Sequence, residues 1–135
     1  MGELRHVILV DDNDIVRELM RAMLSREGFA VEAAASGFDA LLIAERDGVV
    51  DLLVTDVYMP GMDGLELADR LVELHPEASV LYTSGHADER ILAPGTVPAG
   101  AAFLPKPFTM AELLRAARDV FAAAAVLRSG DPVAA

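Results

Sequence analysis

The sequence of 135 residues contains no cysteine, so disulfides and thiolate metal sites are both excluded. Its apolar stretches fall far short of the ~20 residues that a membrane-spanning helix needs, and no basic, apolar leader opens the chain. From these absences we expect a cytoplasmic protein without direct membrane contact. Lysine is scarce as well, since Lys106 is the only lysine among the eleven basic residues.

Acidic residues outnumber basic residues by 22 to 11, which gives a formal net charge of −11. A domain this acidic repels phosphate backbones, so we expect no binding to nucleic acid. Hydrophobic residues make up 53% of the chain, a share that is ordinary for a globular protein. The length allows one domain, which we expect over 1–128, followed by a frayed tail over 129–135.

Short apolar runs alternate with segments of helical periodicity along the chain. Strands are predicted at 6–10, 29–33, 49–54, 79–83 and 101–104. Helices are predicted at 14–26, 36–46, 65–75 and 109–127, and their candidate N-caps are Asn13 or Asp14, Ser36 and Thr109. The alternation predicts an α/β fold, with a flavodoxin-like, doubly wound, five-stranded parallel sheet in the order 2-1-3-4-5 and helices on both faces.

Side-chain burial is predicted from the same periodicity. Ile15, Leu19 and Met23 recur at helical spacing in the first helix. In the second helix Leu42 is expected to be buried together with Leu41 and Ala44, while His75 and His86 are expected at the surface. Segment 87–100 contains two prolines and two glycines, which cost a helix interior roughly 3 and about 1 kcal/mol each. A fourth helix there is therefore predicted to be short or irregular.

Polar residues follow the ends of four predicted strands. Asp11 and Asp12 follow the first strand, Asp56 the third, Ser84 the fourth and Lys106 the fifth. The carboxyl ends of parallel strands meet at one edge of a sheet, and these four strands are contiguous in the predicted order, so the groups can face one crevice. Each residue alone has a structural explanation as a helix cap, a turn or a solvated charge, but their joint placement favours a functional site.

The chemistry of this set points to phosphoryl transfer. Three neighbouring carboxylates repel one another unless one takes up a proton or a cation lies among them. Oxygen ligands without histidine or cysteine favour Mg²⁺. The hydroxyl of Ser84 and the ammonium of Lys106 remain as donors to an anion. Asp56 is the best candidate nucleophile, and its attack would give an acyl phosphate.

The segments that carry this pattern resemble the response-regulator receiver domains of bacterial two-component signalling. They are ILVDDND (8–14), LLVTDVYMPGMDGLEL (52–67), VLYTSG (80–85) and FLPKPF (103–108). The resemblance covers roughly residues 5–125. The segment YTSGHADE, followed by a proline-rich stretch, most resembles the corresponding segment in the receiver of a hybrid histidine kinase.

The resemblance implies a set of metal and phosphoryl contacts. Asp56 would be phosphorylated, and Asp12, Asp56 and the main-chain carbonyl of Tyr58 would hold Mg²⁺, with Asp11 helping through water. Lys106 would pair with a phosphoryl oxygen, and its peptide bond to the following proline is typically cis in this family. Ser84 would bond the phosphoryl group.

Switching and partner contacts follow from the resemblance as well. Phe103 matches the aromatic switch position that acts with Ser84, and without a hydroxyl it would work by packing alone. The expected phosphodonor is a histidine kinase or a histidine phosphotransfer domain, docked near Ile15, Pro107 and Phe108. Receivers often dimerise through a face that includes their fourth helix, so an irregular helix there predicts a monomer.

Two other functions share parts of this pattern. A Mg²⁺-dependent phosphatase of the haloacid-dehalogenase kind also uses an aspartate nucleophile at a strand end, but it needs a second acid where Tyr58 stands. A flavin carrier would need a phosphate-binding loop rich in serine, threonine and glycine after the first strand. The carboxylates of residues 11–14 would instead repel a flavin phosphate.

Overall fold

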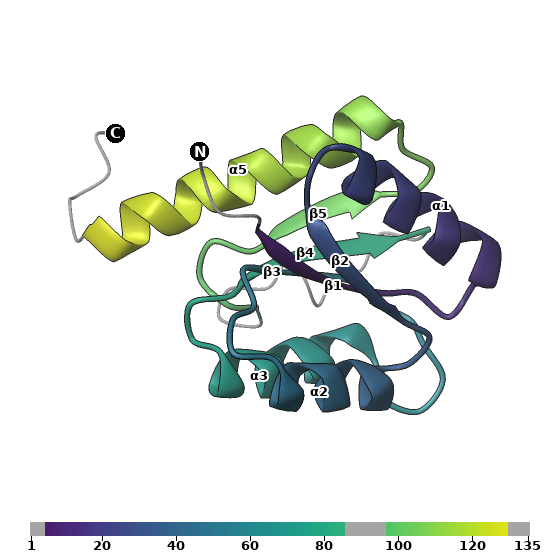
Figure 1. Cartoon of the computed structure of the whole chain (residues 1–135), viewed down its shortest axis with the longest axis horizontal. Coiled ribbons are helices and arrows are strands. Elements are labelled where there is room, and N and C mark those ends of the chain that lie inside the picture. The colour runs from purple at the N-terminus through teal and green to yellow at the C-terminus, as the bar shows by residue number, and fades with distance from the viewer. Residues whose placement is uncertain (1–4, 86–96, 130–135) are drawn as a thin grey trace.

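Five strands and four helices are described in the computed structural model, which covers residues 5–85 and 97–129 (Figure 1). The strands are β1 (His6–Val10), β2 (Ala30–Ala34), β3 (Leu52–Asp56), β4 (Ser79–Ser84) and β5 (Ala102–Pro105). The helices are α1 (Asp14–Arg26), α2 (Gly37–Arg46), α3 (Gly64–Leu74) and α5 (Met110–Ser129). The bounds lie close to those predicted, except that β3 begins at Leu52 rather than at residue 49 and reaches Asp56.

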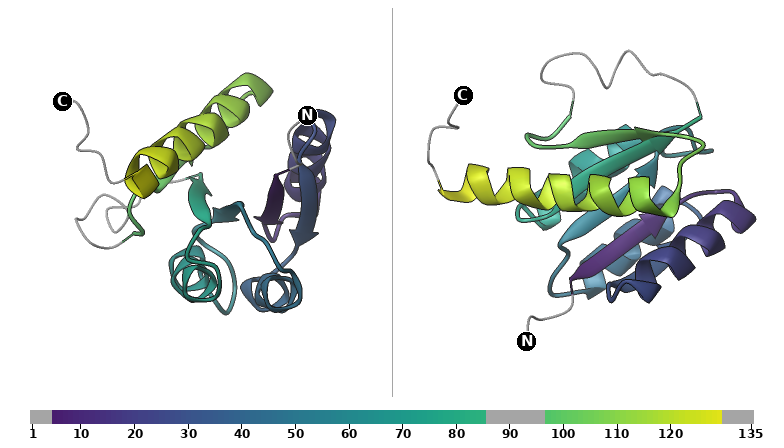
Figure 2. Two further views of the ribbon diagram at one scale, coloured as in Figure 1. Left: turned by 60° about the vertical axis from the view of Figure 1, so that its left-hand side comes forward. Right: turned by 90° about the horizontal axis from the view of Figure 1, so that it is seen from above.

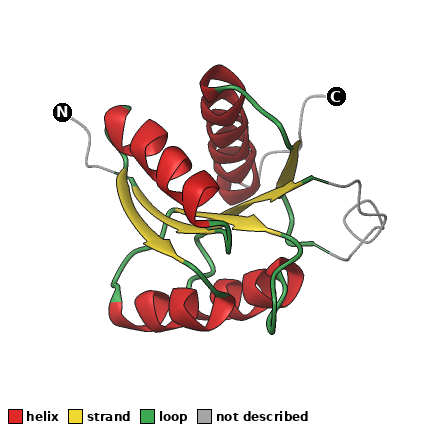
Figure 3. Ribbon diagram, turned by 90° about the vertical axis from the view of Figure 1, so that its right-hand side faces the viewer, coloured by secondary structure: helices red, strands yellow, loops and turns green. Residues whose placement is uncertain are grey.

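The strands form one parallel sheet in the predicted order, β2-β1-β3-β4-β5. Helices α1 and α5 cover one face of the sheet, and α2 and α3 cover the other (Figures 1 and 2). All the carboxyl ends therefore meet at one edge, which Figure 3 shows from that side. At this edge Asp56 lies opposite Thr83, and Ser84 lies opposite Pro105.

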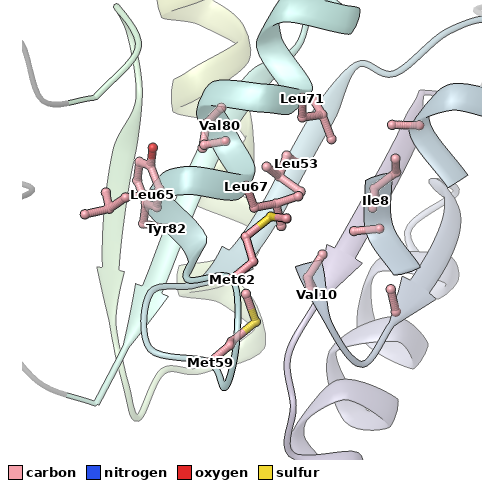
Figure 4. Packing of buried hydrophobic residues seen from close by; sticks show 14 of the residues in the cluster. Ile8, Val10, Leu53, Met59, Met62, Leu65, Leu67, Leu71, Val80 and Tyr82 are labelled. Atoms are coloured by element: carbon pink, nitrogen blue, oxygen red, sulfur yellow. The ribbon is translucent and has the colours of Figure 1, made fainter. Parts of the chain in front are cut away.

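Buried apolar side chains form one cluster on each face of the sheet. Ile8 and Leu53 point toward α2 and α3, where they join a cluster that contains Leu67 and Leu71 (Figure 4). Their strand neighbours, such as Leu9, point to the opposite face and join a second cluster. Successive side chains of a strand alternate between faces, so the central strands are buried on both sides. This explains why they read as continuous apolar runs in the sequence.

The predicted N-caps are confirmed at three helices. The side-chain oxygen of Asn13 accepts hydrogen bonds from the backbone N–H groups of Ile15 and Val16 in the first turn of α1, both at 3.0 Å. Ser36 accepts one from the first turn of α2 at 3.1 Å. Thr109 and Glu112 exchange bonds as a capping box at the start of α5. Asp11 and Asp12 therefore lie in the short turn between the end of β1 and the Asn13 cap of α1.

The predicted burial of Leu42 is wrong, because its side chain is 64% exposed. Ala40 and Ala44 are the fully buried residues of this part of α2. These two residues lie one turn apart on the same face, and Leu42 lies midway between them along the chain, on the opposite face. Small residues thus face the sheet, and the larger apolar side chain is left outside.

The predicted surface position of His75 is also wrong, since the residue is only 7% exposed. His75 is the C-cap of α3, and its Nε2–H donates to the carbonyl of Ala44 at 2.7 Å. That carbonyl belongs to the last turn of α2, where helix carbonyls lack intrahelical partners. The other ring nitrogen lies 3.2 Å from a carboxylate oxygen of Glu77. The imidazole therefore joins the ends of two helices.

Some predictions fall on residues that the structure does not describe. The irregular fourth helix is one of them, because only 97–100 of its segment are described. His86 and the tail over 130–135 also lie outside the described residues, whereas Ser129 is the last residue of α5. Among residues 5–85 and 97–129, no helix is both long and apolar enough to cross a membrane.

Replacing Tyr82 with phenylalanine is expected to stabilise the domain by about 1 kcal/mol. The side chain is fully buried in the cluster of Figure 4, and no group in the described part of the chain pairs with its hydroxyl. Burial also raises the pKa of this phenol. A buried hydroxyl without a partner loses its hydration and gains nothing in return. Urea unfolding measures the effect, and a marked loss of stability would mean that the hydroxyl has a partner.

Candidate functional site

A polar cleft of about 580 Å³ lies at the carboxyl edge of the sheet. It is lined by Asp11, Asp12, Asn13, Val16, Asp56, Tyr58, Ser84, Gly85 and Lys106. Every residue to which the sequence assigned a metal or phosphoryl contact is therefore in one place.

The ends of the strands position these residues. Asp56 is the last residue of β3, and Ser84 is the last residue of the neighbouring strand β4, one residue beyond the partner of Asp56. Lys106 follows β5, and its backbone N–H donates to the carbonyl of Ser84 at 2.8 Å, which continues the β4–β5 pairing past the last strand residue. The peptide bond between Lys106 and Pro107 is cis, as the resemblance implied.

The ammonium of Lys106 lies between two carboxylates. Its Nζ is 2.7 Å from Oδ2 of Asp11 and 3.4 Å from Oδ2 of Asp56. Burial disfavours the charged ammonium, but the bond and the charge of Asp11 outweigh burial, so the pKa of Lys106 is raised. Burial also raises the pKa of Asp56, together with the charge of Asp11 and against the attraction of Lys106. The lysine is thus held as a cation beside a carboxylate that is poorly solvated.

Asp11, Asp12 and Asp56 each offer a carboxylate oxygen within 4.8 Å of the others. Asp11 is buried, Asp56 is half-buried, and Asp12 is exposed to solvent. This set of oxygen donors, open on one side, suits a hard cation such as Mg²⁺, which keeps several of its waters. Lys106 is closer to Asp11 than to Asp56, at 2.7 Å against 3.4 Å, so the buried carboxylate of Asp11 is the one most engaged by the lysine.

The two aromatic residues singled out in the sequence differ in position. Tyr58 lines the cleft, and its side chain is 48% exposed. Phe103 lies opposite Tyr82 on the neighbouring strand, and it packs against the core cluster on the α2 and α3 face. Phe103 therefore lies on the face of the sheet that α2 and α3 cover, and it is not among the residues that line the cleft.

An apolar groove of about 470 Å³ adjoins the cleft. It is lined by Val16, Leu19, Met20, Met23, Gly85, Lys106, Pro107 and Phe108. Ile15 is not among these residues, but it lies one turn from Leu19 on α1 and is 81% exposed. The helix buries Met20 and Leu24 instead. Of the three apolar residues at helical spacing, Ile15 and Leu19 therefore form an exposed ridge, whereas Met23 is partly buried against the core.

Arg17 of α1 contacts the loop of this site, and the sequence analysis did not single it out. Its Nη1 donates to the backbone carbonyl of Asp11 at 2.9 Å, and its Nη2 donates to Asp14 at 2.6 Å. The side chain is only 20% exposed. The spacing of Asp14 and Arg17 on one helix face predicts their ion pair, but nothing in the sequence marks the contact with the loop.

Comparison with known proteins decides the family. The family model of the response regulator receiver domain matches residues 7–118. This chain belongs to the response regulator receiver domain family. Receiver domains of this family are the phosphoacceptors of two-component systems, so the function predicted from the sequence is confirmed at this level.

Relatives include sensor kinases and response regulators. The sensor kinase CckA of Brucella abortus is 40% identical over 116 residues, which cover 84% of this chain and 12% of that protein. The response regulator MprA of Mycobacterium leprae is 40% identical over 111 residues, which cover 80% of this chain and 47% of that protein. The chain therefore spans less than half the length of either relative.

Solved receiver structures share the fold. A response regulator receiver protein from Sinorhizobium medicae has a TM-score of 0.81 and 32% identity, covering 90% of this chain and 98% of its own. The receiver domain of the hybrid histidine kinase CckA has a TM-score of 0.71 and 34% identity, covering 85% and 97%. The predicted likeness to a hybrid-kinase receiver is confirmed, and the phosphatase alternative finds no support.

Proposed function

We propose that this chain accepts a phosphoryl group on Asp56 from the phosphohistidine of a histidine kinase or a histidine phosphotransfer domain. The observation that carries the proposal is the convergence of three carboxylates and the only lysine of the chain on one cleft. As an oxygen of Asp56 bonds to phosphorus, the bond from phosphorus to the histidine nitrogen breaks, and that nitrogen keeps the electron pair.

The residues around Asp56 have distinct parts in this proposal. Asp12, Asp56 and the Tyr58 carbonyl would hold Mg²⁺, with Asp11 acting through water, and the ion would offset negative charge on the phosphoryl oxygens. Lys106, now between two carboxylates, would turn one of its N–H donors to a phosphoryl oxygen. Ser84 would donate its hydroxyl to another. Phe103 would respond to the movement of Ser84 by repacking.

The wider setting of the domain belongs to the same proposal. The likeness to a hybrid-kinase receiver favours a place in a phosphorelay, in the cytoplasm, with control of protein partners as the output. The domain would catalyse only its own phosphorylation and dephosphorylation. A monomeric state, the absence of nucleic-acid and membrane contacts, and a domain boundary near residue 128 stay predictions.

Replacing Ile15 with aspartate is expected to slow phosphoryl transfer from the protein donor by about 30-fold, the effect of losing an interface residue worth about 2 kcal/mol. Ile15 continues the exposed ridge of α1 beside the apolar groove that contains Pro107 and Phe108. A donor that reaches Asp56 would cover this apolar surface, and a buried aspartate there would be strongly disfavoured. Transfer is measured with a radiolabelled phosphohistidine donor.

A matched control is Leu42→Asp, because Leu42 is 64% exposed on α2, at the opposite face of the sheet. It should leave transfer unchanged. Acetyl phosphate needs no docking surface, so both variants should be labelled by it as the wild type is. Equal loss with both donors would point to misfolding, and normal transfer to Ile15→Asp would place the docking surface elsewhere.

A further inference from the structure

The backbone on both sides of Asp12 is held by hydrogen bonds. The carbonyl of Asp11, in the peptide unit before Asp12, accepts from Nη1 of Arg17 at 2.9 Å. The N–H of Asn13, in the peptide unit after Asp12, donates to Oδ1 of Asp11 at 2.9 Å. Since a residue's two soft dihedrals are set by its flanking peptide planes, these bonds fix the direction of the Cα–Cβ bond of Asp12, from which its exposed carboxylate extends.

We infer that Arg17 is a positioning residue for cation binding, because it aims the Asp12 carboxylate at the space shared with Asp11 and Asp56. The inference rests on the proposed Mg²⁺ site. Arg17 belongs to the second turn of α1 and reaches back to the loop, while its other terminal nitrogen is held by Asp14 at 2.6 Å. The guanidinium therefore ties the loop to the helix, which a planar fork of donors can do.

Positioning and simple electrostatics predict opposite results. The guanidinium carries a positive charge close to the acidic cluster, and by Coulomb's law alone its removal would strengthen the binding of a cation. If Arg17 acts by holding the Asp11–Asp12 peptide unit, its removal weakens binding. Residues that orient metal ligands from outside the first coordination shell typically change metal affinity by about 10- to 100-fold. The sign of the change therefore identifies the role.

The test is calorimetric titration of the purified chain with Mg²⁺, comparing the wild type with Arg17→Met. Methionine keeps an unbranched stem for packing and removes the donors. The Kd for Mg²⁺ is expected to rise about 10-fold, and the Mg²⁺ concentration that gives half-maximal labelling by acetyl phosphate should rise in parallel. Arg17→Lys keeps the charge without the fork and should weaken binding less.

Arg21→Met is the matched control, because Arg21 lies on the same helix and is paired with Glu18. It removes the same charge without touching the loop, so its Kd should match or fall below that of the wild type. An unchanged or lower Kd in folded Arg17→Met overturns the inference, and if that variant does not fold, an unchanged Kd in Arg17→Lys does so. A wild type that binds no Mg²⁺ contradicts the proposed function itself.

Discussion

Replacing Asp56 with asparagine is expected to abolish phosphorylation of the chain by acetyl phosphate, whereas the wild type should gain one phosphoryl group. Asp56 ends β3 in the cleft, within 4.8 Å of two other carboxylates and 3.4 Å from Nζ of Lys106. An amide at this position is a poor nucleophile, and it removes one of the charges that favour the cation. The intact mass of the protein measures the product directly.

Two controls separate the nucleophile from its surroundings. Asp39→Asn removes an exposed carboxylate from the first turn of α2, and its labelling should equal that of the wild type. Chelation of Mg²⁺ should stop labelling of the wild type and of this control alike. Full modification of Asp56→Asn would show that another residue is the phosphoacceptor, and labelling after chelation would show that no cation is needed.

The architecture and the cleft were accessible from the sequence because both depend on local patterns. Buried parallel strands require uninterrupted apolar runs, and the first polar residue after each run marks the edge where ligands bind. The ends of β1, β3 and β4 could be found in this way. The end of β5 was found through Lys106, since the single lysine of an arginine-rich chain stands out by composition alone.

The features that the sequence did not reveal depend on contacts between distant residues. His75 is buried because it reaches a carbonyl 31 residues earlier in the chain. Periodicity finds an apolar stripe on α1 but cannot tell that Met20 and Leu24 face the sheet while Ile15 and Leu19 stay outside. Arg17 reads as one more charge on a solvated face until the fold brings its side chain over the loop. Packing decides each of these cases.

Replacing Gly64 with alanine is expected to destabilise the domain by about 3 kcal/mol, at the upper end of the usual cost of overpacking. Gly64 is the first residue of α3, and its N–H donates to the carbonyl of Val57 at 2.8 Å. A methyl group there would lie 2.1 Å from the backbone oxygen of Asp56 and 3.1 Å from Oγ1 of Thr55. Neither β3 nor the start of α3 can move away freely, because the strand is central in the sheet and the helix is capped by Asp63.

The atom in the way belongs to the proposed phosphoacceptor, so the same variant should also label poorly with acetyl phosphate. Urea unfolding gives the stability, and with a slope of roughly 2 kcal/mol per molar the midpoint should fall by about 1.5 M. Gly48→Ala is the matched control: a methyl group there meets no atom within 4 Å, so its stability should stay within about 0.5 kcal/mol of the wild type. Equal midpoints for the two variants would mean that β3 and α3 separate at little cost. In that case the position of Asp56 would not depend on the close approach of Gly64.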